Sequence, residues 1–254
     1  MKDSIPLLEF DPEREAIIEP AKVIKHRDVP ERCVFCFFRE VIDQAKKRLN
    51  LYPLRPIKSD MGEIPVFSAI YNGRAMGVVP AAVGAPLAAS LFEVIIARGG
   101  RKFIACGGAG VLDSSIGSGD IVVPTSAVRD EGTSYHYLPP DREAHPSPQA
   151  VDAITRVLER HKCRYVKGKT WTTDGLYRET PNRVAKRRKQ GCLTVEMEAA
   201  ALFAVAEFRG VHIGQLLYGG DDVSGIEWNR RELGQKISAR DTLFWLSLEA
   251  CAEM

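Results

Sequence analysis

The stretch Glu198–Gly220, EAAALFAVAEFRGVHIGQLLYGG, predicts a buried helix that leads directly into a buried strand. Apolar residues occupy nearly every side of its first half, which is typical of a helix surrounded by a protein core. Gly210 marks the expected end of that helix, because glycine readily adopts the left-handed conformation of a helix C-cap. The apolar run that follows has the length of a strand. Together these features indicate a layered α/β protein.

Strands and helices alternate on both sides of this stretch. Asn72-Gly73 between two short apolar runs predicts a β-hairpin, and a proline-rich loop is expected before it. The alternation predicts a single-domain α/β/α sandwich whose mixed central sheet is covered by helices on both faces. The expected strands are 33–38, 64–72, 74–81, 102–108, 120–128, 165–173 and 211–220. The expected helices are 39–50, 86–100, 148–161, 198–210 and 239–253, the last with Ser238 as its N-cap.

Composition and charge restrict the class of partner. A chain of 254 residues with 45% hydrophobic residues can form one substantial core. We expect residues 1–30, which are polar and interrupted by prolines, to form an N-terminal arm, and residues 31–254 to form the α/β domain. The 35 basic and 33 acidic residues leave a formal charge of +2, which does not indicate a nucleic-acid or membrane-surface binder. A small molecule is therefore the expected partner.

Features that would place the protein outside the cytoplasm are not found in the sequence. No apolar run approaches the roughly 18 residues that a membrane-spanning helix needs, and MKDSIPLLEFDPERE at the amino end lacks the apolar stretch of a signal peptide. We therefore predict a cytoplasmic protein. The basic run RVAKRRKQG, residues 183–191, fits the solvent-facing side of a helix better than a nucleic-acid site, because acidic residues elsewhere balance it.

The cysteines are interpreted as reduced thiols. Most of the six lie among apolar residues, as core thiols do. Cys33 and Cys36 form a C-x-x-C pair, which can be redox-active or provide half of a zinc site. In a buried strand, however, residues three apart face opposite sides, and no second pair of ligands stands nearby. Core packing is therefore the favoured interpretation.

Three loops are expected at the carboxyl ends of strands, where ligands of α/β proteins gather. They are CGGAG (106–110), TVEME (194–198) and YGGDD (218–222). Gly107 and Gly108 would let a ligand approach backbone N–H groups, although a glycine turn can also serve only to reverse the chain. The pattern is not G-x-G-x-x-G, so we do not expect a nicotinamide cofactor.

Two pairs of carboxylates stand in these loops. Glu196 and Glu198 would face the same side of an extended segment, and a bend at the helix start would bring both, with Met197, toward one pocket. A carboxylate there can accept hydrogen bonds from the vicinal hydroxyls of a ribose, or it can simply complement the amino end of the helix. Asp221 and Asp222 can belong to a solvated turn. A partly desolvated aspartate among other acids would instead have a raised pKa and act as a proton donor.

The motifs in succession resemble the nucleoside phosphorylase superfamily of the uridine phosphorylase and hexameric purine nucleoside phosphorylase type, including its nucleosidase branch. The resemblance covers about residues 33–228, and the E-M-E followed by small residues is its most specific part. It implies that the central sheet is partly barrel-like. The motifs are VGAPLAASLFEVI, FIACGGAG, GDIVVPTSAVRDEGTSYHY, KTWTTDGLY, TVEMEAAAL and YGGDD.

On the sugar side, the resemblance implies that Glu198 binds the ribose hydroxyls and that Met197 packs on the sugar. His136 would approach the 5′ end of the ribose in its own or a neighbouring subunit's site. As a lone histidine, His136 can equally be an ordinary polar surface residue. On this basis the two charges of TVEME face a ligand, and the apolar helix behind them holds the loop rigid.

On the base side, the resemblance implies that Glu196 lies near the base and that Leu176 and Tyr177 line the base pocket. Asp221 matches the acid that protonates N7 of a departing purine. The glutamine and arginine with which uridine phosphorylases read a pyrimidine would follow Tyr177, but this segment supplies only Arg178 and, further on, Asn182. A purine is therefore slightly favoured over uridine.

The residues that would bind phosphate depart from the family pattern. Ala105 stands where phosphorolytic relatives have an arginine, and FFREV replaces the usual G-D-P-x-x-R loop, although Arg39 can still bind a phosphate bidentately. Gly107 and Gly108 would complete that subsite. For a third arginine, lent by a neighbouring subunit, the nearest cations are Lys58 and Arg55.

The sequence therefore predicts an enzyme that cleaves the N-glycosidic bond of a ribonucleoside by phosphorolysis, giving free base and ribose 1-phosphate. One alternative is a hydrolytic nucleosidase, because Glu40 stands close to that branch's water-activating glutamate. The other is a catalytically inactive nucleoside-binding sensor. No metal or organic cofactor is expected, and inorganic phosphate would be a co-substrate. The resemblance also implies a homo-oligomer, which would be a dimer, trimer or hexamer.

Overall fold

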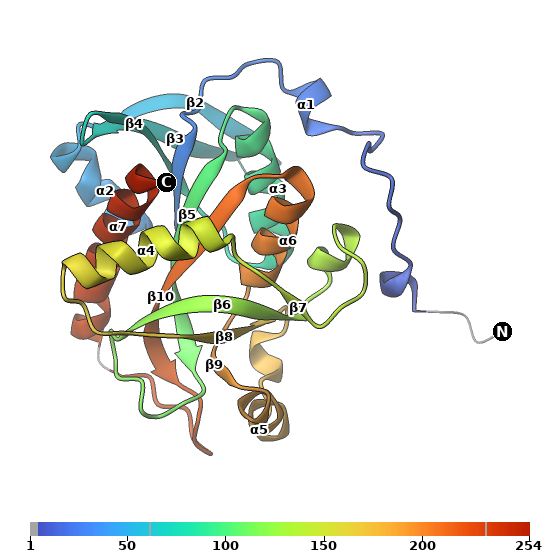
Figure 1. Ribbon diagram of the computed structural model, residues 1–254, viewed down its shortest axis with the longest axis vertical. Coiled ribbons are helices and arrows are strands. Elements are labelled where there is room, and N and C mark those ends of the chain that lie inside the picture. The colour runs from blue at the N-terminus through green and yellow to red at the C-terminus, as the bar shows by residue number, and fades with distance from the viewer. Residues whose placement is uncertain (1–4, 61, 232) are drawn as a thin grey trace.

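The computed structural model describes residues 5–60, 62–231 and 233–254, and Figure 1 shows how their elements are arranged. The strands are β1 (Arg32–Cys36), β2 (Tyr52–Ser59), β3 (Gly62–Tyr71), β4 (Arg74–Pro80), β5 (Lys102–Val111), β6 (Ile121–Asp130), β7 (Glu143–Ala144), β8 (Tyr165–Thr173), β9 (Cys192–Glu196) and β10 (His212–Asp222). The α-helices are α1 (Pro20–Val23), α2 (Arg39–Arg48), α3 (Ala85–Ala97), α4 (Pro148–Arg160), α5 (Pro181–Lys189), α6 (Ala199–Arg209) and α7 (Leu233–Glu253). The short 3-10 helices are η1 (Pro6–Leu8), η2 (Thr133–His136) and η3 (Leu176–Arg178).

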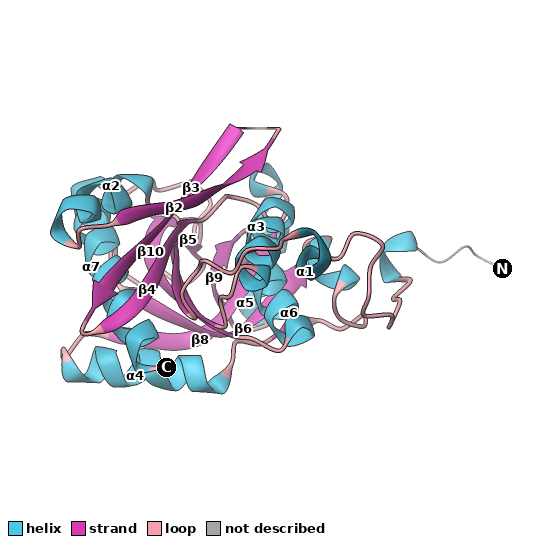
Figure 2. Ribbon diagram, turned by 90° about the horizontal axis from the view of Figure 1, so that it is seen from above, coloured by secondary structure: helices cyan, strands magenta, loops and turns pink. Residues whose placement is uncertain are grey.

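The strands form one mixed sheet that is partly closed. Five of them, in the order β10, β6, β8, β9 and β5, make a barrel because β10 also pairs in parallel with β5. From β5 the sheet continues as an open layer through β1, β4 and β3 to β2, which lies with β3 at one edge (Figure 2). The predicted α/β fold with a mixed, partly barrel-like sheet is confirmed.

Helices cover the sheet on two sides (Figure 1). On one side α2, α4 and α7 contribute to a core that includes Cys36, and on the other α3 and α6 contribute to a core that includes Cys33. Because side chains of a strand alternate between its two faces, these cysteines three positions apart enter different cores. All six cysteines are free thiols. The interpretation of the C-x-x-C pair as core packing is therefore confirmed.

Residues 5–31 run along the side of the molecule formed by α3 and α6 (Figure 1). Asp28 accepts two hydrogen bonds from the guanidinium of Arg98, at 2.9 and 2.8 Å. Glu19 accepts one from Arg209 at 2.9 Å. Ile17 and Ile18, which precede Glu19, remain exposed. Two ion pairs therefore hold this segment against the helices.

The hairpin is formed as predicted, but the segment before it differs from the prediction. Asn72 and Gly73 have positive φ values of 48° and 73°, which the tight turn between β3 and β4 requires. The proline-rich segment is not a loop but strand β2. Prolines at positions 53 and 56 are tolerated because β2 is an edge strand, pairs only with β3, and shifts its register between Leu54 and Ile57.

The glycine-rich turn expected after residue 105 is also absent from the described structure. Instead β5 continues through all of CGGAG to Val111, paired with β10. The glycines provide space: a Cβ at Gly108 would lie 2.9 Å from the ring of Tyr218, and one at Gly110 would lie 3.0 Å from Val195. Because these glycines have no side chains, neighbouring strands pack closely against this part of β5. A continuous strand therefore lies where a turn was expected.

The last helix begins earlier than predicted. Because α7 starts at Leu233, Ser238 lies inside the helix and is not its N-cap. Serine costs only a fraction of a kcal/mol in a helix interior (about 0.5 kcal/mol relative to alanine), so it does not terminate a helix that packs on the core through Leu243 and Phe244. The basic run 183–191 lies largely in α5, as predicted.

No helix in the described part of the chain has the length and hydropathy needed to cross a bilayer.

Candidate active site

A cavity of about 410 Å³ lies where β5, β9 and β10 approach their carboxyl ends. It brings together most of the residues that the sequence predicted for a nucleoside site. Those that line it are Gly107, Gly108, Leu176, Glu196, Met197, Glu198 and Asp221. Segments that are far apart in the chain thus contribute to one cavity, as expected for the loop ends of an α/β sheet.

Glu196 is a buried anchor at the start of α6. Its Oε2 accepts hydrogen bonds from the backbone N–H groups of Glu198 and Ala199, at 2.7 and 2.6 Å, and its Oε1 accepts one from the Thr172 hydroxyl at 2.6 Å. Burial raises the pKa of Glu196 to about 7, while these hydrogen bonds act to lower it. Glu196 therefore stabilises the amino end of α6 through hydrogen bonds to both of its carboxyl oxygens.

Glu198 has a different environment two positions later. Its Oε1 accepts the N–H of Gly84 at 2.6 Å, and only 6% of the residue is exposed. Burial and the neighbouring charge of Glu196 raise the pKa of Glu198 to about 8, against the opposing effect of backbone N–H groups. Glu198 therefore lies in the wall of the cavity as a buried carboxyl group held by the backbone N–H of Gly84.

The end of β10 also lines the cavity. Asp221 accepts a hydrogen bond from the indole Nε1 of Trp228 at 2.6 Å. Asp222, by contrast, is bound by Arg231 at 3.0 Å and by the backbone N–H of Ser224 at 2.8 Å, and it does not line the cavity. Of the two adjacent aspartates, only Asp221 is thus placed to meet a ligand.

Arg240 of α7 provides positive charge at this cavity. Its Nη1 lies 2.7 Å from Oε1 of Glu40, and its Nε donates to the Tyr218 hydroxyl at 3.1 Å. The guanidinium also lies over the Phe38 ring, 5.3 Å from its centroid. Among the described lining residues, Arg240 is the single cation, opposite four carboxyl groups. The electrostatic character of the cavity is therefore acidic.

A family model described as the phosphorylase superfamily matches residues 31–239 of this chain. The chain belongs to this superfamily. The predicted resemblance to this superfamily is thereby confirmed.

Similar proteins carry several activities in their names. The guanosine phosphorylase of Halorubrum lacusprofundi is 30% identical over 154 residues, which make up 61% of this chain and 64% of that protein, slightly less than two thirds of its length. The fold is shared with the purine nucleoside phosphorylase of Toxoplasma gondii in complex with immucillin-H, at a TM-score of 0.80 and 17% identity over 94% of this chain and 97% of that one. It is also shared with the AMP nucleosidase of Bacteroides thetaiotaomicron, at a TM-score of 0.71 and 20% identity over 89% of both chains.

Some residues predicted from the superfamily pattern lie outside the cavity. Glu40 faces Arg240 but does not line the cavity, and His136 lies in η2. Tyr177 is 94% exposed. Arg39 lines a different cavity, with Cys36, Glu63 and Pro80 among its neighbours. In the single chain, these side chains are not brought to Glu198 and Asp221.

The other cations predicted to bind phosphate do not line this cavity either. Lys58 lies on β2, 3.6 Å from Glu63, with most of its side chain exposed. Ala105, which stands in place of an arginine, is fully buried in the core beneath α3 and α6. Within the described residues, therefore, the predicted phosphate subsite consists of Gly107 and Gly108 without an adjacent free arginine.

Four polar side chains in the lining were not predicted. Gln215, buried within an apolar strand, has an Oε1 atom without a hydrogen-bond partner in the described structure, and a lone amide in an apolar run is a usable sequence signal. Glu179 follows the predicted base segment by two positions. No local sequence pattern predicts that Tyr218 and Arg240 line the cavity, because their positions depend on how α7 packs against β10.

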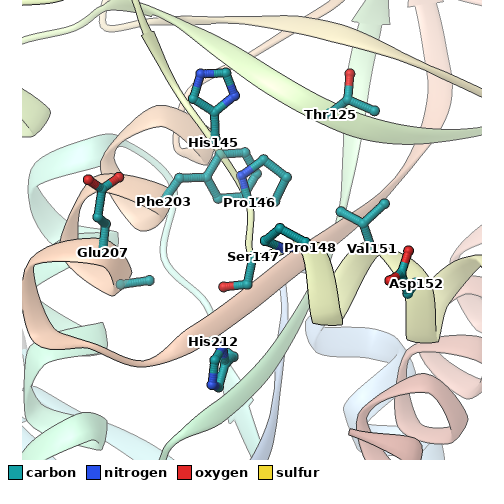
Figure 3. A pocket seen from close by; sticks show the side chains of 11 residues that line it. Thr125, His145, Pro146, Ser147, Pro148, Val151, Asp152, Phe203, Glu207 and His212 are labelled. Atoms are coloured by element: carbon teal, nitrogen blue, oxygen red, sulfur yellow. The ribbon is translucent and has the colours of Figure 1, made fainter.

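A second cavity, of about 630 Å³, lies at the other end of β10 (Figure 3). His212, which begins that strand, lines it together with His145, Ser147 and Glu207. The Ser147 hydroxyl is already bound by the N–H of Ile213 at 3.0 Å. Although larger, this cavity has no buried carboxylates, so the chemistry favours the first one. No group of three or more His, Cys, Asp or Glu residues in the described chain is arranged to hold a metal ion.

Proposed function

We propose that the protein cleaves the N-glycosidic bond of a purine ribonucleoside by phosphorolysis, giving the free base and ribose 1-phosphate. The observation that carries this proposal is that Glu198 and Asp221 line the same cavity, although they are far apart in the chain. A carboxylate is suited to accept hydrogen bonds from the 2′ and 3′ hydroxyls of a ribose. An acid across the cavity is suited to the base.

The proposed chemistry follows from charge development at the glycosidic bond. As that bond lengthens, positive charge grows on the ribosyl group and negative charge grows on the base. Asp221 donates a proton to N7 of the purine, which makes the base a neutral leaving group. Glu198 holds the sugar, and Met197 packs on its apolar face. No step needs a metal or an organic cofactor, so activity is expected to persist in the presence of a chelator.

The purine assignment has three supports. N7 is an acceptor that pyrimidines lack, and the proposed role of Asp221 is to protonate it. The similarity to a guanosine phosphorylase agrees with this choice. A purine also fits a cavity of about 410 Å³ that is lined by Leu176, Phe37 and Phe38.

Hydrolysis is the second candidate, and one specific observation favours it. The lining has four carboxyl groups, Arg240 is already paired with Glu40, and the family's arginine position is occupied by the buried Ala105. A doubly charged phosphate is repelled by such a surface, whereas a water molecule is not. In phosphorolysis, Arg240 would have to break its ion pair with Glu40 and bind the phosphate instead.

Base release from a panel of ribonucleosides, with and without inorganic phosphate, tests these proposals. Release that requires phosphate supports phosphorolysis, and release at the same rate without phosphate supports the nucleosidase. Binding without release of base, seen as a rise in the melting temperature with nucleoside, would contradict both reactions and favour the sensor. Size-exclusion chromatography with light scattering would test the homo-oligomer that the resemblance implies.

A further inference from the structure

Gln215 is a buried amide in the cavity wall to which the proposed reaction assigns no task. It lies in β10 between Ile213 and Leu217, two fully buried apolar residues on the same face of the strand, and only 1% of it is exposed. Among the residues that the structure describes, none forms a hydrogen bond with its Oε1 atom. An unpaired buried amide oxygen is costly, so a ligand that donates a hydrogen bond to it would stabilise the protein.

The strand pairing places Gln215 beside the predicted phosphate subsite. In the parallel ladder between β5 and β10, Gln215 is the partner of Ala105. Leu217, two positions further on, is the partner of Gly107. Residues two apart in a strand share a face, so Gln215 and Gly107 lie on the same face of the sheet. Asp221 follows Gln215 by six positions, which corresponds to at most about 20 Å along β10. Gln215 therefore lies toward the end of the cavity away from the proposed proton donor.

The proposed reaction brings its nucleophile to this end. A nucleophile attacks the anomeric carbon from the side away from the departing base, so with the base at Asp221 the phosphate enters from the other end. One oxygen of hydrogen phosphate forms a bond to C1′ as the C1′–N9 bond breaks. The electron pair of that bond passes to the base, which takes its proton from Asp221. The P–O–H group stays on the phosphate throughout and remains a hydrogen-bond donor.

Charge is a poor means of selecting phosphate in this cavity. Among the described lining residues, four carboxyl groups accompany one cation, Arg240, which is already bound to Glu40. Such a lining weakens the binding of every doubly charged anion to a similar degree. The neutral amide of Gln215 adds no repulsion, and it offers both an acceptor and a donor. The P–O–H group is suited to donate to its Oε1, while another phosphate oxygen accepts from its NH2 group.

We infer that Gln215 determines specificity for the co-substrate, and that its amide recognises the hydroxyl of hydrogen phosphate through this pair of hydrogen bonds. An oxyanion is then selected by its O–H group, whereas an arginine selects it by charge and by its oxygens alone. This inference rests on the proposed function, because phosphorolysis is what brings phosphate to this end of the cavity. Sulfate is the discriminating probe: it has the shape and the double charge of hydrogen phosphate but no hydroxyl near neutral pH, whereas hydrogen arsenate has one.

Calorimetric binding of phosphate, arsenate and sulfate to the wild type and to Gln215→Met tests this inference. Methionine keeps the length of the side chain but donates no hydrogen bond and accepts only weakly. We expect the wild type to bind phosphate and arsenate roughly 10- to 150-fold more tightly than sulfate, the range for a hydrogen bond to a charged group, and the variant to bind all three alike. Gln44→Met, the same change at an exposed position of α2, is the matched control and should keep the wild-type preference.

Kinetics and stability separate recognition of phosphate from a structural role. Gln215→Met should raise the KM for phosphate by a similar factor and leave the KM for the nucleoside nearly unchanged. The melting temperature of the ligand-free variant should equal or exceed that of the wild type, because an unpaired buried amide is removed. A lower melting temperature together with an unchanged preference for phosphate over sulfate would show a structural role and overturn the inference.

Failure of the proposed function would be recognised separately. Base release at the same rate with and without phosphate would show that the reaction is not phosphorolysis, whereas anion binding decides the role of Gln215. A wild type that binds phosphate and sulfate equally, or binds neither, would contradict the inference without any variant. A preference for phosphate that Gln215→Met abolishes would support it, even if no nucleoside in the panel is cleaved.

Discussion

The two walls of the cavity differ in how they are held. The wall built by β9 and α6 is buried, and the oxygens of Glu196 are occupied by two backbone N–H groups and the Thr172 hydroxyl. The wall built by η3 and the end of β10 is open: Leu176 is 51% exposed, and Trp228, which binds Asp221, is 61% exposed. A rigid wall suits a part of the ligand that never varies, and an open wall suits a part that does.

This difference matches the two halves of a nucleoside. The ribose is common to all of them, and the proposed ribose contact, Glu198, is fixed by Gly84 and by the helix behind it. The base varies, and the residues proposed to meet it lie on a three-residue 3-10 helix, at Leu176, and at the end of β10, at Asp221. A few substitutions on the open wall can therefore change the base without disturbing the sugar site.

The largest effect is expected from Asp221→Asn on the open wall. The amide keeps the shape of the side chain but cannot donate the acidic proton, so kcat should fall by roughly 10²- to 10⁴-fold while nucleoside binding changes little. Steady-state kinetics and calorimetric binding measure the two quantities. A variant with wild-type kcat would remove Asp221 from its assigned role.

On the rigid wall, Glu198→Ala should weaken binding of a purine ribonucleoside by roughly 10- to 150-fold, because hydrogen bonds from the sugar to a charged acceptor are lost. Binding of the free base should remain nearly intact. The comparison of the two ligands on the same protein is the control. Equal weakening of both would show that the assignment of the sugar to this wall is wrong.

Glu196→Ala should act on stability instead of recognition. It leaves two backbone N–H groups and the Thr172 hydroxyl without their acceptor, at a cost of about 1 to 3 kcal/mol in the free energy of unfolding. Urea unfolding measures this change. A variant of wild-type stability with weakened base binding would instead support a direct contact between Glu196 and the base.

The same pair of acids predicts how stability depends on pH. The pKa values of Glu196 and Glu198, about 7 and about 8, lie above the 4.5 of a glutamate in water. Between these limits the folded protein binds more protons than the unfolded chain, so the wild-type free energy of unfolding should fall as the pH rises from about 5 to about 8. The fall should be shallower in Glu196→Ala, because one of the two raised groups is gone and the other loses a neighbouring charge.

The smallest effect is expected from Trp228→Phe. The change removes the hydrogen bond that orients Asp221 but keeps an aromatic ring at the edge of the cavity. A loss of about 0.5 to 1.5 kcal/mol corresponds to roughly a two- to tenfold lower kcat/KM. If Trp228→Phe lowered kcat/KM as much as Asp221→Asn does, the open wall would be as rigid as the buried one.

The residues of the two walls could not be predicted equally well from the sequence. Periodic apolar runs predicted most helices and strands, since burial of one face imposes that pattern directly. The motif TVEME pointed to Glu198, because two charges inside an apolar stretch need a partner. The closure of β10 onto β5 and the positions of Glu179 and Arg240 depend on contacts between distant segments, and no local pattern reports them. The same reason explains why β2 was predicted as a loop. Prolines disfavour strands except at the edge of a sheet, and only the assembled sheet shows which strand is at its edge.

The close approach of Tyr218 to Gly108 links the barrel to the charge of the cavity. The aromatic ring fits because position 108 has no side chain, and its hydroxyl in turn holds Arg240. Even a methyl group at position 108 would push the ring aside and carry the guanidinium with it. Replacement of the Gly108 hydrogen by a methyl group would thus change the position of the positive charge in the cavity, although position 108 itself carries no charge.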